Sequence, residues 1–232
     1  MSTINIDLPN KDIDLKKCWS FHDIYESFEV HARTQLPFYD MLHEMLATII
    51  HSYIHLCGEV IDVGCANGNL FKVYKNIYGS SGVYWYHLED ESKYSPPYEK
   101  LTTKHLVDTA QDVFSDEYKD GADKYQVIVA NLTLSFIDPK ERSSLIEAMK
   151  QKLAKGGALI IVDKFFAPEA RLATVYRNLM WAHKVQQNVS GNDIVQKEMS
   201  LIGVQTPLEI EDCWGMERFF QYGEFIGFIH EA

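Results

Sequence analysis

The residues with the clearest potential for chemistry lie in a glycine-rich stretch that follows an apolar run. The run Val60 to Val63 has the length of a buried strand and contains a carboxylate, Asp62. Gly64 and Gly68 follow, and glycine is needed where the backbone bends sharply or where a ligand lies against bare main chain. Asn67 is expected to cap a helix whose apolar residues recur at helical spacing. These apolar residues are Leu70, Val73, Tyr74 and Ile77. A strand, a loop and a helix in this order predict a ligand site at the carboxyl end of a sheet.

The spacing of the glycines narrows the ligand class. It is Gly-x-x-x-Gly rather than the dinucleotide pattern Gly-x-Gly-x-x-Gly, and no Lys-Ser or Lys-Thr pair follows to hold phosphates. A cofactor without phosphate, such as S-adenosylmethionine, therefore fits better than a dinucleotide. The alternative is an ordinary strand-to-helix turn that binds nothing.

Composition and charge exclude several classes of protein. The 232 residues are 46% hydrophobic and 24% charged, which is ordinary for one globular domain. The net charge of −11 argues against non-specific binding to nucleic acid, although it leaves a local tRNA contact open. No run approaches the ~20 apolar residues of a membrane span, and the first residues do not resemble a signal peptide. We therefore expect a cytoplasmic protein with no membrane partner.

The thiols and imidazoles do not form a metal motif. Cys18, Cys57, Cys65 and Cys213 are widely spaced, with no Cys-x-x-Cys. Of the histidines, two lie four residues apart at positions 51 and 55, but no Glu follows the first to complete a zinc motif. We expect no metal.

The rest of the chain alternates between strand and helix patterns. Residues 1–18 are polar and are expected to form a flexible arm, followed by one domain over 19–232. A helical pattern covers Trp19 to His55 with an interruption at Pro37, and it is expected to cover the edge of a sheet. Strand patterns then occur at 60–63, 83–88, 105–107, 126–130 and 158–162.

The second half of the chain carries sharper helix and turn signals. Asp138 is expected to cap a helix with Pro139 at its first position, and this helix is expected to stop at Gly156 and Gly157. The pattern continues with a long helix over 169–188 and a loop at 190–193 that starts a further helix. It ends with a capping box at 206–209 and a hairpin over 218–229 that turns at Gly223. The alternation predicts an α/β fold with a doubly wound, mostly parallel sheet, helices on both faces and a C-terminal antiparallel hairpin.

Four blocks of sequence carry a resemblance to a known family. They are 129–142, 153–165, 219–228, and Arg33 with Pro37-Phe38-Tyr39. Along most of residues 20–230 the chain resembles the class I S-adenosylmethionine-dependent methyltransferases. The resemblance is closest to the carboxy-S-adenosylmethionine synthase family, whose enzymes act in tRNA wobble-uridine modification. It implies a seven-stranded Rossmann-like sheet, S-adenosylmethionine as cofactor, transferase activity and a homodimer.

The resemblance also implies how the cofactor is held. Asp62 and the loop residues Gly64, Cys65, Ala66 and Gly68 would hold the amino-acid end of the methionine moiety, because an ammonium needs acceptors and a carboxylate needs donors. Glu89 would accept both ribose hydroxyls, and the alternative is an exposed loop acid like its neighbours Asp90 and Glu91. The adenine ring would be read by Asp112 and Val113, with Asp108 as a competing register. Asn131 would contact the cofactor from the end of the fourth strand, and Arg33 and Tyr39 would close over the methionine carboxylate.

Departures from the family favour plain methyl transfer. Residues 90–99 are polar and broken by prolines where the family has a helix. Between Thr206 and Arg218 the synthases are expected to place an arginine for the extra carboxylate of their product, and Ile210 to Gly215 stand there instead. A carboxylate in the cleft without a cationic partner would be strongly disfavoured. The first hypothesis is therefore methyl transfer to an unidentified acceptor, either a small molecule or a tRNA-related one. Carboxy-S-adenosylmethionine synthesis and an inactive S-adenosylmethionine-binding partner subunit are the alternatives.

The acceptor side has only weak candidates. Lys164, Tyr176, Met180, Trp181 and His183 follow the fifth strand and could line it, and packing is an equally good role for each. Tyr176 and His183 are the weak catalytic candidates, although methyl transfer demands no acid or base. Ser95-Pro96-Pro97-Tyr98 matches the base-holding motif of amino-group DNA methyltransferases, but it follows the second strand rather than the fourth, and we interpret it as a coincidental loop.

Overall fold

The computed structural model of the chain describes residues 27–54, 57–90 and 102–232. Within these residues the strands form one seven-stranded sheet in the order β3-β2-β1-β4-β5-β7-β6. The strands are β1 (Gly58–Val63), β2 (Val83–Glu89), β3 (Thr103–Val107), β4 (Tyr125–Asn131), β5 (Leu153–Lys164), β6 (Glu217–Tyr222) and β7 (Phe225–Glu231). The first five pair in parallel, and β7 is antiparallel to both β5 and β6. The predicted doubly wound sheet with a C-terminal hairpin is confirmed.

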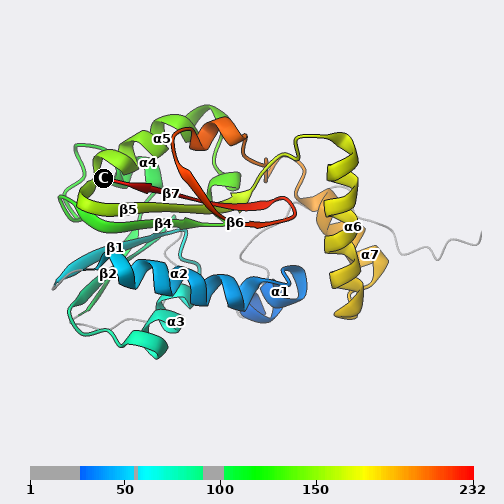
Figure 1. Cartoon of the computed structure of the whole chain (residues 1–232), viewed down its shortest axis with the longest axis horizontal. Coiled ribbons are helices and arrows are strands. Elements are labelled where there is room, and N and C mark those ends of the chain that lie inside the picture. Colours follow the sequence, from blue (N-terminus) through cyan, green and yellow to red (C-terminus); the bar gives the residue numbers. More distant parts are fainter. Residues whose placement is uncertain (1–26, 55–56, 91–101) are drawn as a thin grey trace, which may run out of the picture.

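Helices cover both faces of this sheet (Figure 1). They are α1 (Phe28–Gln35), α2 (Tyr39–Tyr53), α3 (Asn69–Tyr78), α4 (Ala110–Val113), α5 (Pro139–Gln151), α6 (Ala170–Gln186) and α7 (Gly191–Ser200), with short 3₁₀ helices η2 (Leu134–Phe136) and η3 (Ile210–Cys213). In Figure 1, α2 and α3 lie on one side of the sheet and α4 and α5 on the other. Helices α6 and α7 stand beyond the carboxyl ends of the parallel strands, next to α1.

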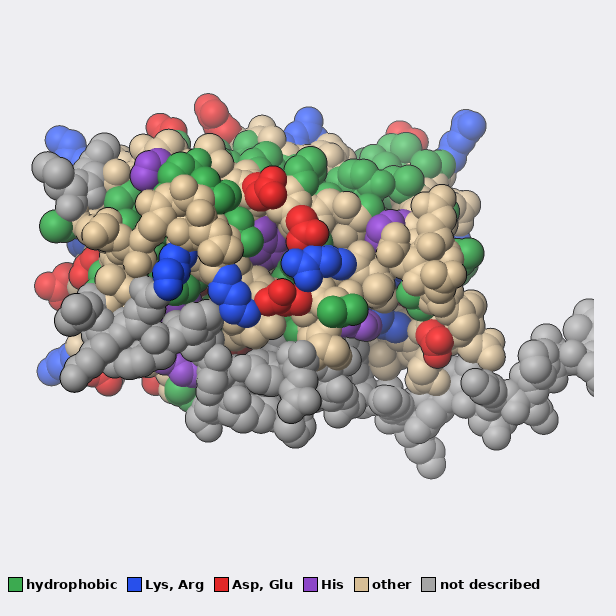
Figure 2. All heavy atoms as spheres, turned by 90° about the horizontal axis from the view of Figure 1, so that it is seen from below, with side chains coloured by type: hydrophobic (Ala, Val, Ile, Leu, Met, Phe, Trp, Pro, Cys, Tyr) green, Lys and Arg blue, Asp and Glu red, His purple; other side chains and the backbone are tan. Residues whose placement is uncertain are grey.

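The surface around α1 carries charges of both signs. Arg33 pairs with Glu29 at 3.5 Å and with Asp40 at 2.9 Å, and Glu29 also accepts from Lys72 at 2.9 Å. Figure 2 shows basic and acidic side chains interspersed on the face of the molecule seen from below in Figure 1. This pattern is typical of a solvated surface rather than of a phosphate-binding face.

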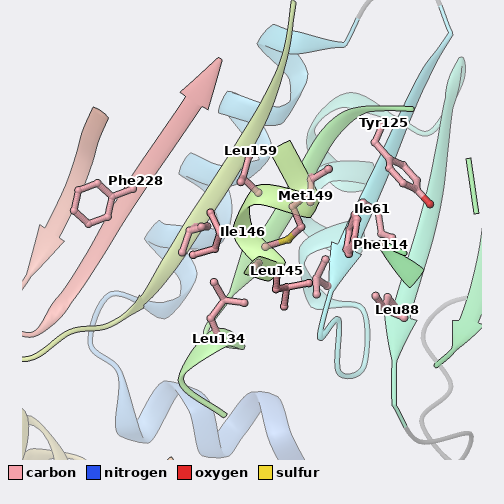
Figure 3. Packing of buried hydrophobic residues seen from close by; sticks show 14 of the residues in the cluster. Ile61, Leu88, Phe114, Tyr125, Leu134, Leu145, Ile146, Met149, Leu159 and Phe228 are labelled. Carbon is pink, nitrogen blue, oxygen red and sulfur yellow. The ribbon is translucent and has the colours of Figure 1, made fainter. Parts of the chain in front are cut away.

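Two apolar layers bury the sheet on both sides. On one side Leu145, Ile146 and Met149 of α5 point at the strands and contact residues such as Ile61 and Leu159 (Figure 3). On the other side α2 and α3 pack on the alternate residues of the same strands. Because a parallel sheet covered on both faces has no solvent side, its strands read as continuous apolar runs.

The helix over 39–53 covers a face of the sheet and not its edge, so the prediction for this helix was wrong on that point. Helix α2 contacts β4 and β5 in the middle of the sheet, and Leu42, Leu46 and Ile50 are fully buried there. The interruption at Pro37 is confirmed, since it lies between α1 and α2. An apolar stripe identifies the buried side of a helix, but it does not say which part of the sheet lies beneath.

Three helix boundaries differ from the predictions. Asn67 does not cap α3: Gly68 does, with φ +70, and no side chain accepts from the first turn. The capping box lies at Glu209 and Asp212, where it opens η3, and not at 206–209. Helix α5 ends at Gln151 instead of reaching the two glycines.

Gly156 and Gly157 lie inside strand β5, which begins at Leu153 rather than at residue 158. A Cβ on Gly157 would lie 2.6 Å from the main-chain oxygen of Gln126, so glycine is needed here for close approach of the neighbouring strand. The glycines therefore mark a strand irregularity instead of a helix end.

Other local predictions are confirmed. The Asp138 side chain accepts from the amide of Lys140 at 3.0 Å, with Pro139 at the first helical position. The side chain of Ser190 caps α7, and Gly223 turns the β6–β7 hairpin with φ +60. The buried Arg142 joins α5 to the segment before η3, because it donates to the main-chain oxygens of residues 135, 137, 206 and 207.

Several predictions fall outside the described residues. These are the arm over 1–18, the start of the first helical pattern and the Ser95-Pro96-Pro97-Tyr98 motif. Within the described ranges, no helix is both long and apolar enough to cross a membrane, and no group of three or more His, Cys, Asp or Glu could hold a metal.

Candidate cofactor and substrate site

A pocket of about 830 Å³ opens where the parallel strands end and the helices α1, α6 and α7 approach. The ends of β1, β2 and β4 and the loops that follow them line one part of it, and the helices line the rest. This is the position at which open α/β sheets bind ligands, beside the strand where the order reverses. Its volume lies in the upper part of the range for small-molecule sites, roughly 300–1,000 Å³.

Asp62 lies at the floor of this pocket, near the end of β1. Its side chain is buried, with 3% of the residue exposed, and Glu89 approaches from the end of β2. Burial raises the pKa of Asp62 to about 8, and repulsion by Glu89 adds to the rise. A cationic ligand would reverse this effect because it would stabilise the ionised carboxylate. The site is therefore suited to a positively charged group.

The glycine-rich loop bends between β1 and α3 through left-handed backbone. Gly64, Ala66 and Gly68 have φ values of +69, +51 and +70. A Cβ on Gly64 would lie 2.4 Å from Oγ1 of Thr133, whose hydroxyl donates to the Val63 carbonyl at 2.8 Å. Only glycine therefore lets the loop pass so close to the end of β4, and the loop presents its main chain to the pocket.

Cys65 lines the pocket but is not suited to act as a nucleophile. The residue is buried, and burial together with the neighbouring carboxylates Asp62 and Glu89 raises the pKa of its thiol well above the ordinary value. A protonated thiol is a poor nucleophile. Its position is consistent with packing against a ligand.

Glu89 reaches back to the glycine-rich loop. Its Oε1 atom accepts a hydrogen bond from the amide of Ala66, so the carboxylate lies between β2 and the loop. This contact places an acceptor at the strand end where the resemblance expects the ribose hydroxyls. The ribose role stays a prediction.

Of the two residues expected over the methionine carboxylate, the structure brings one to the pocket. Tyr39 lines it and accepts a hydrogen bond from Nδ2 of Asn69 at 2.7 Å. Arg33 is exposed, lies outside the pocket lining and pairs with Asp40 and Glu29. Its guanidinium carbon lies 5.8 Å from the centroid of the Tyr39 ring, so it holds that ring from outside.

On the expected adenine side, the competing register lies at the pocket. Asp108, Thr109 and Gln111 line it, and Asp112 and Val113 do not. The Asp112 carboxylate accepts from the Thr109 hydroxyl at 2.6 Å, and Val113 is 4% exposed and belongs to the same apolar layer as Leu145 of α5. The four-residue helix α4 turns these two residues away from the pocket.

Asn131 ends β4 and lines the pocket with a buried acceptor. Its Oδ1 atom has no hydrogen-bond partner among the described residues, and the same holds for Oδ1 of Asn67 in the glycine-rich loop. Buried acceptors without a donor are costly, so each favours a ligand that supplies one. The amino group and ribose hydroxyls of S-adenosylmethionine are such donors. The residues present therefore fit this cofactor.

The five acceptor-side candidates divide in two. Lys164, Met180 and Trp181 line the pocket, and the Lys164 ammonium lies 3.3 Å from Glu224. Tyr176 and His183 do not line it. The Tyr176 side chain lies against Gly223 of the hairpin turn, and Nε2 of His183 lies 3.1 Å from the carbonyl oxygen of Arg33. Both face neighbouring main chain, so the structure gives neither a place beside a reacting group.

A family model described as a methyltransferase domain matches residues 34–197, which is more than half of the chain. The chain belongs to this methyltransferase family. The membership confirms the prediction of an S-adenosylmethionine-dependent methyltransferase, made from the glycine-rich loop and the family resemblance.

Two curated relatives are similar to nearly the whole chain at low identity. The chain is 24% identical over 224 residues to the carboxy-S-adenosyl-L-methionine synthase of Staphylococcus epidermidis. This match covers 91% of this chain and 96% of the relative. It is 25% identical over 205 residues to the protein of the same name from Escherichia coli O9:H4, over 83% of this chain and 79% of the relative.

Solved structures share the fold. The plantazolicin methyltransferase BpumL in complex with SAH superposes with a TM-score of 0.53 at 12% identity, over 82% of this chain and 69% of that one. A putative O-methyltransferase from Nostoc punctiforme gives a TM-score of 0.52 at 9% identity, over 90% and 59% of the two chains. At these identities the likeness shows the fold alone, and it confirms the Rossmann-like class I architecture.

The structure also reveals pocket residues of the methyltransferase that the sequence reasoning missed. Arg177 and Lys184 of α6 and Lys197 of α7 line the pocket together with Glu198. A signal was present, since the pocket-lining residues of α6 recur at positions 177, 180, 181 and 184, which share one face of a helix. Spacing alone does not show what covers a helix, so the sequence did not assign the charged members of this face to the pocket.

Proposed function

We propose that the protein binds S-adenosylmethionine at the acidic end of its pocket and transfers the methyl group to a small acceptor held against α6 and α7. The observation that carries this proposal is that Asp62, Glu89 and Asn131, from three adjacent strands, line one pocket with the glycine-rich loop. Their acceptor atoms match a ligand that carries an ammonium and ribose hydroxyls.

The chain's own residues would act mainly by binding and alignment. An ionised Asp62 would hold the amino group, Glu89 the ribose hydroxyls and Asn131 a further donor of the same ligand. S-adenosylmethionine supplies an electrophilic methyl group when bound. The protein then needs to align the acceptor with that group and exclude water, which requires no general acid or base.

Calorimetric titration with S-adenosylhomocysteine tests the site. Wild-type protein should bind, and Asp62→Asn and Glu89→Gln should each weaken binding about tenfold or more, because each removes a charged acceptor. Asp116→Asn is the matched control, since that carboxylate is fully exposed and lies outside the pocket. No binding by the wild type, or equal binding by all four proteins, would overturn the proposal.

Carboxy-S-adenosylmethionine synthesis is the second candidate, and two observations favour it. The relatives of that name match nearly the whole chain. The pocket also contains Arg177, Lys184 and Lys197, so a carboxylate in the cleft would have cationic partners although none stands between Thr206 and Arg218. This corrects the sequence-based reason for disfavouring the synthase.

One incubation separates the two reactions. The protein is mixed with S-adenosylmethionine, with and without prephenate, and the adenosyl products are identified by mass spectrometry. A carboxylated nucleoside formed only with prephenate supports the synthase. S-adenosylhomocysteine formed with another acceptor supports methyl transfer. Binding without any turnover supports the third candidate, an inactive partner subunit.

The quaternary structure belongs to the same proposal. The outer face of α6 exposes Val175, Leu179 and Val185, with 51%, 41% and 58% of each residue accessible. Exposed apolar side chains on one helix support a homodimer, and sedimentation velocity of the pure protein tests it. A tRNA partner has weaker support, because a net charge of −11 opposes binding to phosphates.

A further inference from the structure

Most charged residues of the pocket are divided by sign. The acidic ones at the strand ends and the loops after them are Asp62, Glu89, Asp90, Asp108 and Asp138. The exception is Lys164 at the end of β5, which is paired with Glu224 of the hairpin turn at 3.3 Å. The wall formed by α6 and α7 instead contributes Arg177, Lys184 and Lys197, with Glu198 as its one acid among the described lining residues of these two helices. Because S-adenosylmethionine carries a net positive charge, the acidic end suits the cofactor. The basic wall must then serve something else.

Lys184 is buried in this wall. The residue is 7% exposed, and its ammonium lies 3.1 Å from Oε1 of Glu198. The Glu198 side chain is 39% exposed, so water shares its charge. A buried ammonium is costly unless it is well paired, and one half-solvated carboxylate compensates it incompletely. The position favours an additional anion.

Lys197 lies beside Lys184 and also lines the pocket. Its ammonium is 2.6 Å from Nε2 of His31 on α1, and the charges of Lys184 and Glu198 both act on it. Burial, helped by repulsion from Lys184, lowers the pKa of Lys197 to about 8. Burial and both lysines lower the pKa of His31 to about 4, so this imidazole is neutral and accepts from Lys197. The lysines repel each other, and an anion between them would remove the repulsion.

Trp181 adds a neutral donor to the same wall. Its indole N–H is buried and has no acceptor among the described residues. The Arg177 guanidinium lies 5.4 Å from the centroid of its ring and restrains the ring from one side. A buried donor without an acceptor favours a ligand that supplies an oxygen.

We propose that the acceptor of this methyltransferase is a small molecule with a carboxylate or phosphate group, and that Lys184, Lys197 and the Trp181 indole bind that group. The inference rests on the proposed function, since it assigns the part of the pocket that the cofactor does not use. A pocket of about 830 Å³ has room for the cofactor and a second small molecule. The net charge of −11 favours a small anion over a nucleic acid.

The test uses the full chain saturated with S-adenosylhomocysteine and three probes of similar size: benzoate, phenyl phosphate and uncharged benzamide. Calorimetry should show at least one of the two anions binding about tenfold or more tightly than benzamide. The preferred anion then tells which group the acceptor carries. If benzamide binds as tightly as both anions, or if none of the three binds, the inference is overturned.

Three variants and a control assign the residues. Lys184→Met and Lys197→Met should each weaken anion binding about tenfold. Lys155 is an exposed lysine at the opposite end of β5, so Lys155→Met should leave anion binding unchanged. Glu198→Gln should strengthen anion binding, because it removes the competing carboxylate from Lys184. This variant keeps the test decisive if Lys184→Met does not fold. The inference is contradicted if Glu198→Gln binds the anion with unchanged or lower affinity, or if the lysine variants lose no affinity for it.

The outcome is separable from that of the proposed function. S-adenosylhomocysteine affinity depends on the acidic end and should stay within about twofold of wild type in all these variants. Failure of the anion titrations with intact nucleoside binding would remove this inference alone, whereas loss of nucleoside binding by the wild type would remove both.

Discussion

Replacing Asp62 with asparagine should stabilise the fold and at the same time weaken cofactor binding. In the folded protein, burial and Glu89 raise the pKa of this carboxyl from an ordinary 3.8 to about 8. Between these two values the unfolded chain is ionised while the folded chain stays protonated. The raised pKa therefore lowers the free energy of unfolding progressively as the pH rises from about 4 to about 8.

The loss of stability can be calculated from the number of pH units above the ordinary pKa of 3.8. One pKa unit corresponds to about 1.4 kcal/mol, so at pH 7 the buried carboxyl lowers the stability of the wild type by up to about 4 kcal/mol. Asparagine has nearly the shape of the protonated carboxyl and does not titrate. Asp62→Asn should therefore equal the wild type near pH 4 and exceed it by up to about 4 kcal/mol at pH 7.

Binding should change in the opposite direction. A ligand ammonium requires the ionised carboxylate, and below its pKa of about 8 the ionised fraction of Asp62 rises about tenfold per pH unit. Wild-type affinity for S-adenosylhomocysteine should therefore rise between pH 6 and pH 8 and then level off, with about one proton released at pH 7. Asp62→Asn should bind about 10–100-fold more weakly above pH 8, since it loses a charge-assisted hydrogen bond worth about 1.5–3 kcal/mol.

Two assays measure these effects. Urea denaturation at pH 4.5, 6, 7 and 8 gives the free energies of unfolding of both proteins, and calorimetry in buffers of different ionisation enthalpy gives the affinity and the proton count. The exposed Asp116→Asn variant should follow the wild type in both. The reasoning is refuted if Asp62→Asn is less stable than wild type at pH 7, or if wild-type affinity does not depend on pH over this range.

Three further predictions concern other parts of the protein. The affinity of the nucleoside-saturated protein for benzoate should fall about tenfold from pH 7 to pH 9, because Lys197 has a pKa of about 8 and loses its charge. A calorimetric pH series measures this decline, and Lys197→Met should abolish it. Gly64→Ala should destabilise the fold by more than Gly79→Ala in urea denaturation. Both glycines have positive φ, which alone costs about 1–2 kcal/mol, but only the first would bring a Cβ within 2.4 Å of Thr133; equal losses would contradict this. Arg142→Lys should lower the free energy of unfolding by about 3 kcal/mol in the same assay, because one ammonium cannot donate to all the carbonyl oxygens that the buried guanidinium contacts. An unchanged free energy of unfolding would show that water replaces the guanidinium as the donor.

Local signals in the sequence were enough to predict the fold and the strand-end carboxylates that line the pocket. The apolar run before Gly64, the Asp138-Pro139 cap and the turn at Gly223 each depend on the preferences of a few adjacent residues. Such preferences act the same way in any context, so the alternation of strands and helices and their connection could be inferred without coordinates. Boundaries were less certain, because at Gly157 the close approach of the next strand, and not the local sequence, decides the conformation.

The chain by itself thus determined the sheet, the glycine-rich loop and the carboxylates that end its strands. Only the tertiary structure decided that Arg33 pairs with Asp40 and that Asp108 rather than Asp112 reaches the pocket. It also brought Lys184 and Lys197 together in the pocket wall. It also decided that the pKa of Asp62 rises to about 8. Burial and charge repulsion depend on distances between segments far apart in sequence, and those distances exist only once the helices have packed on the sheet.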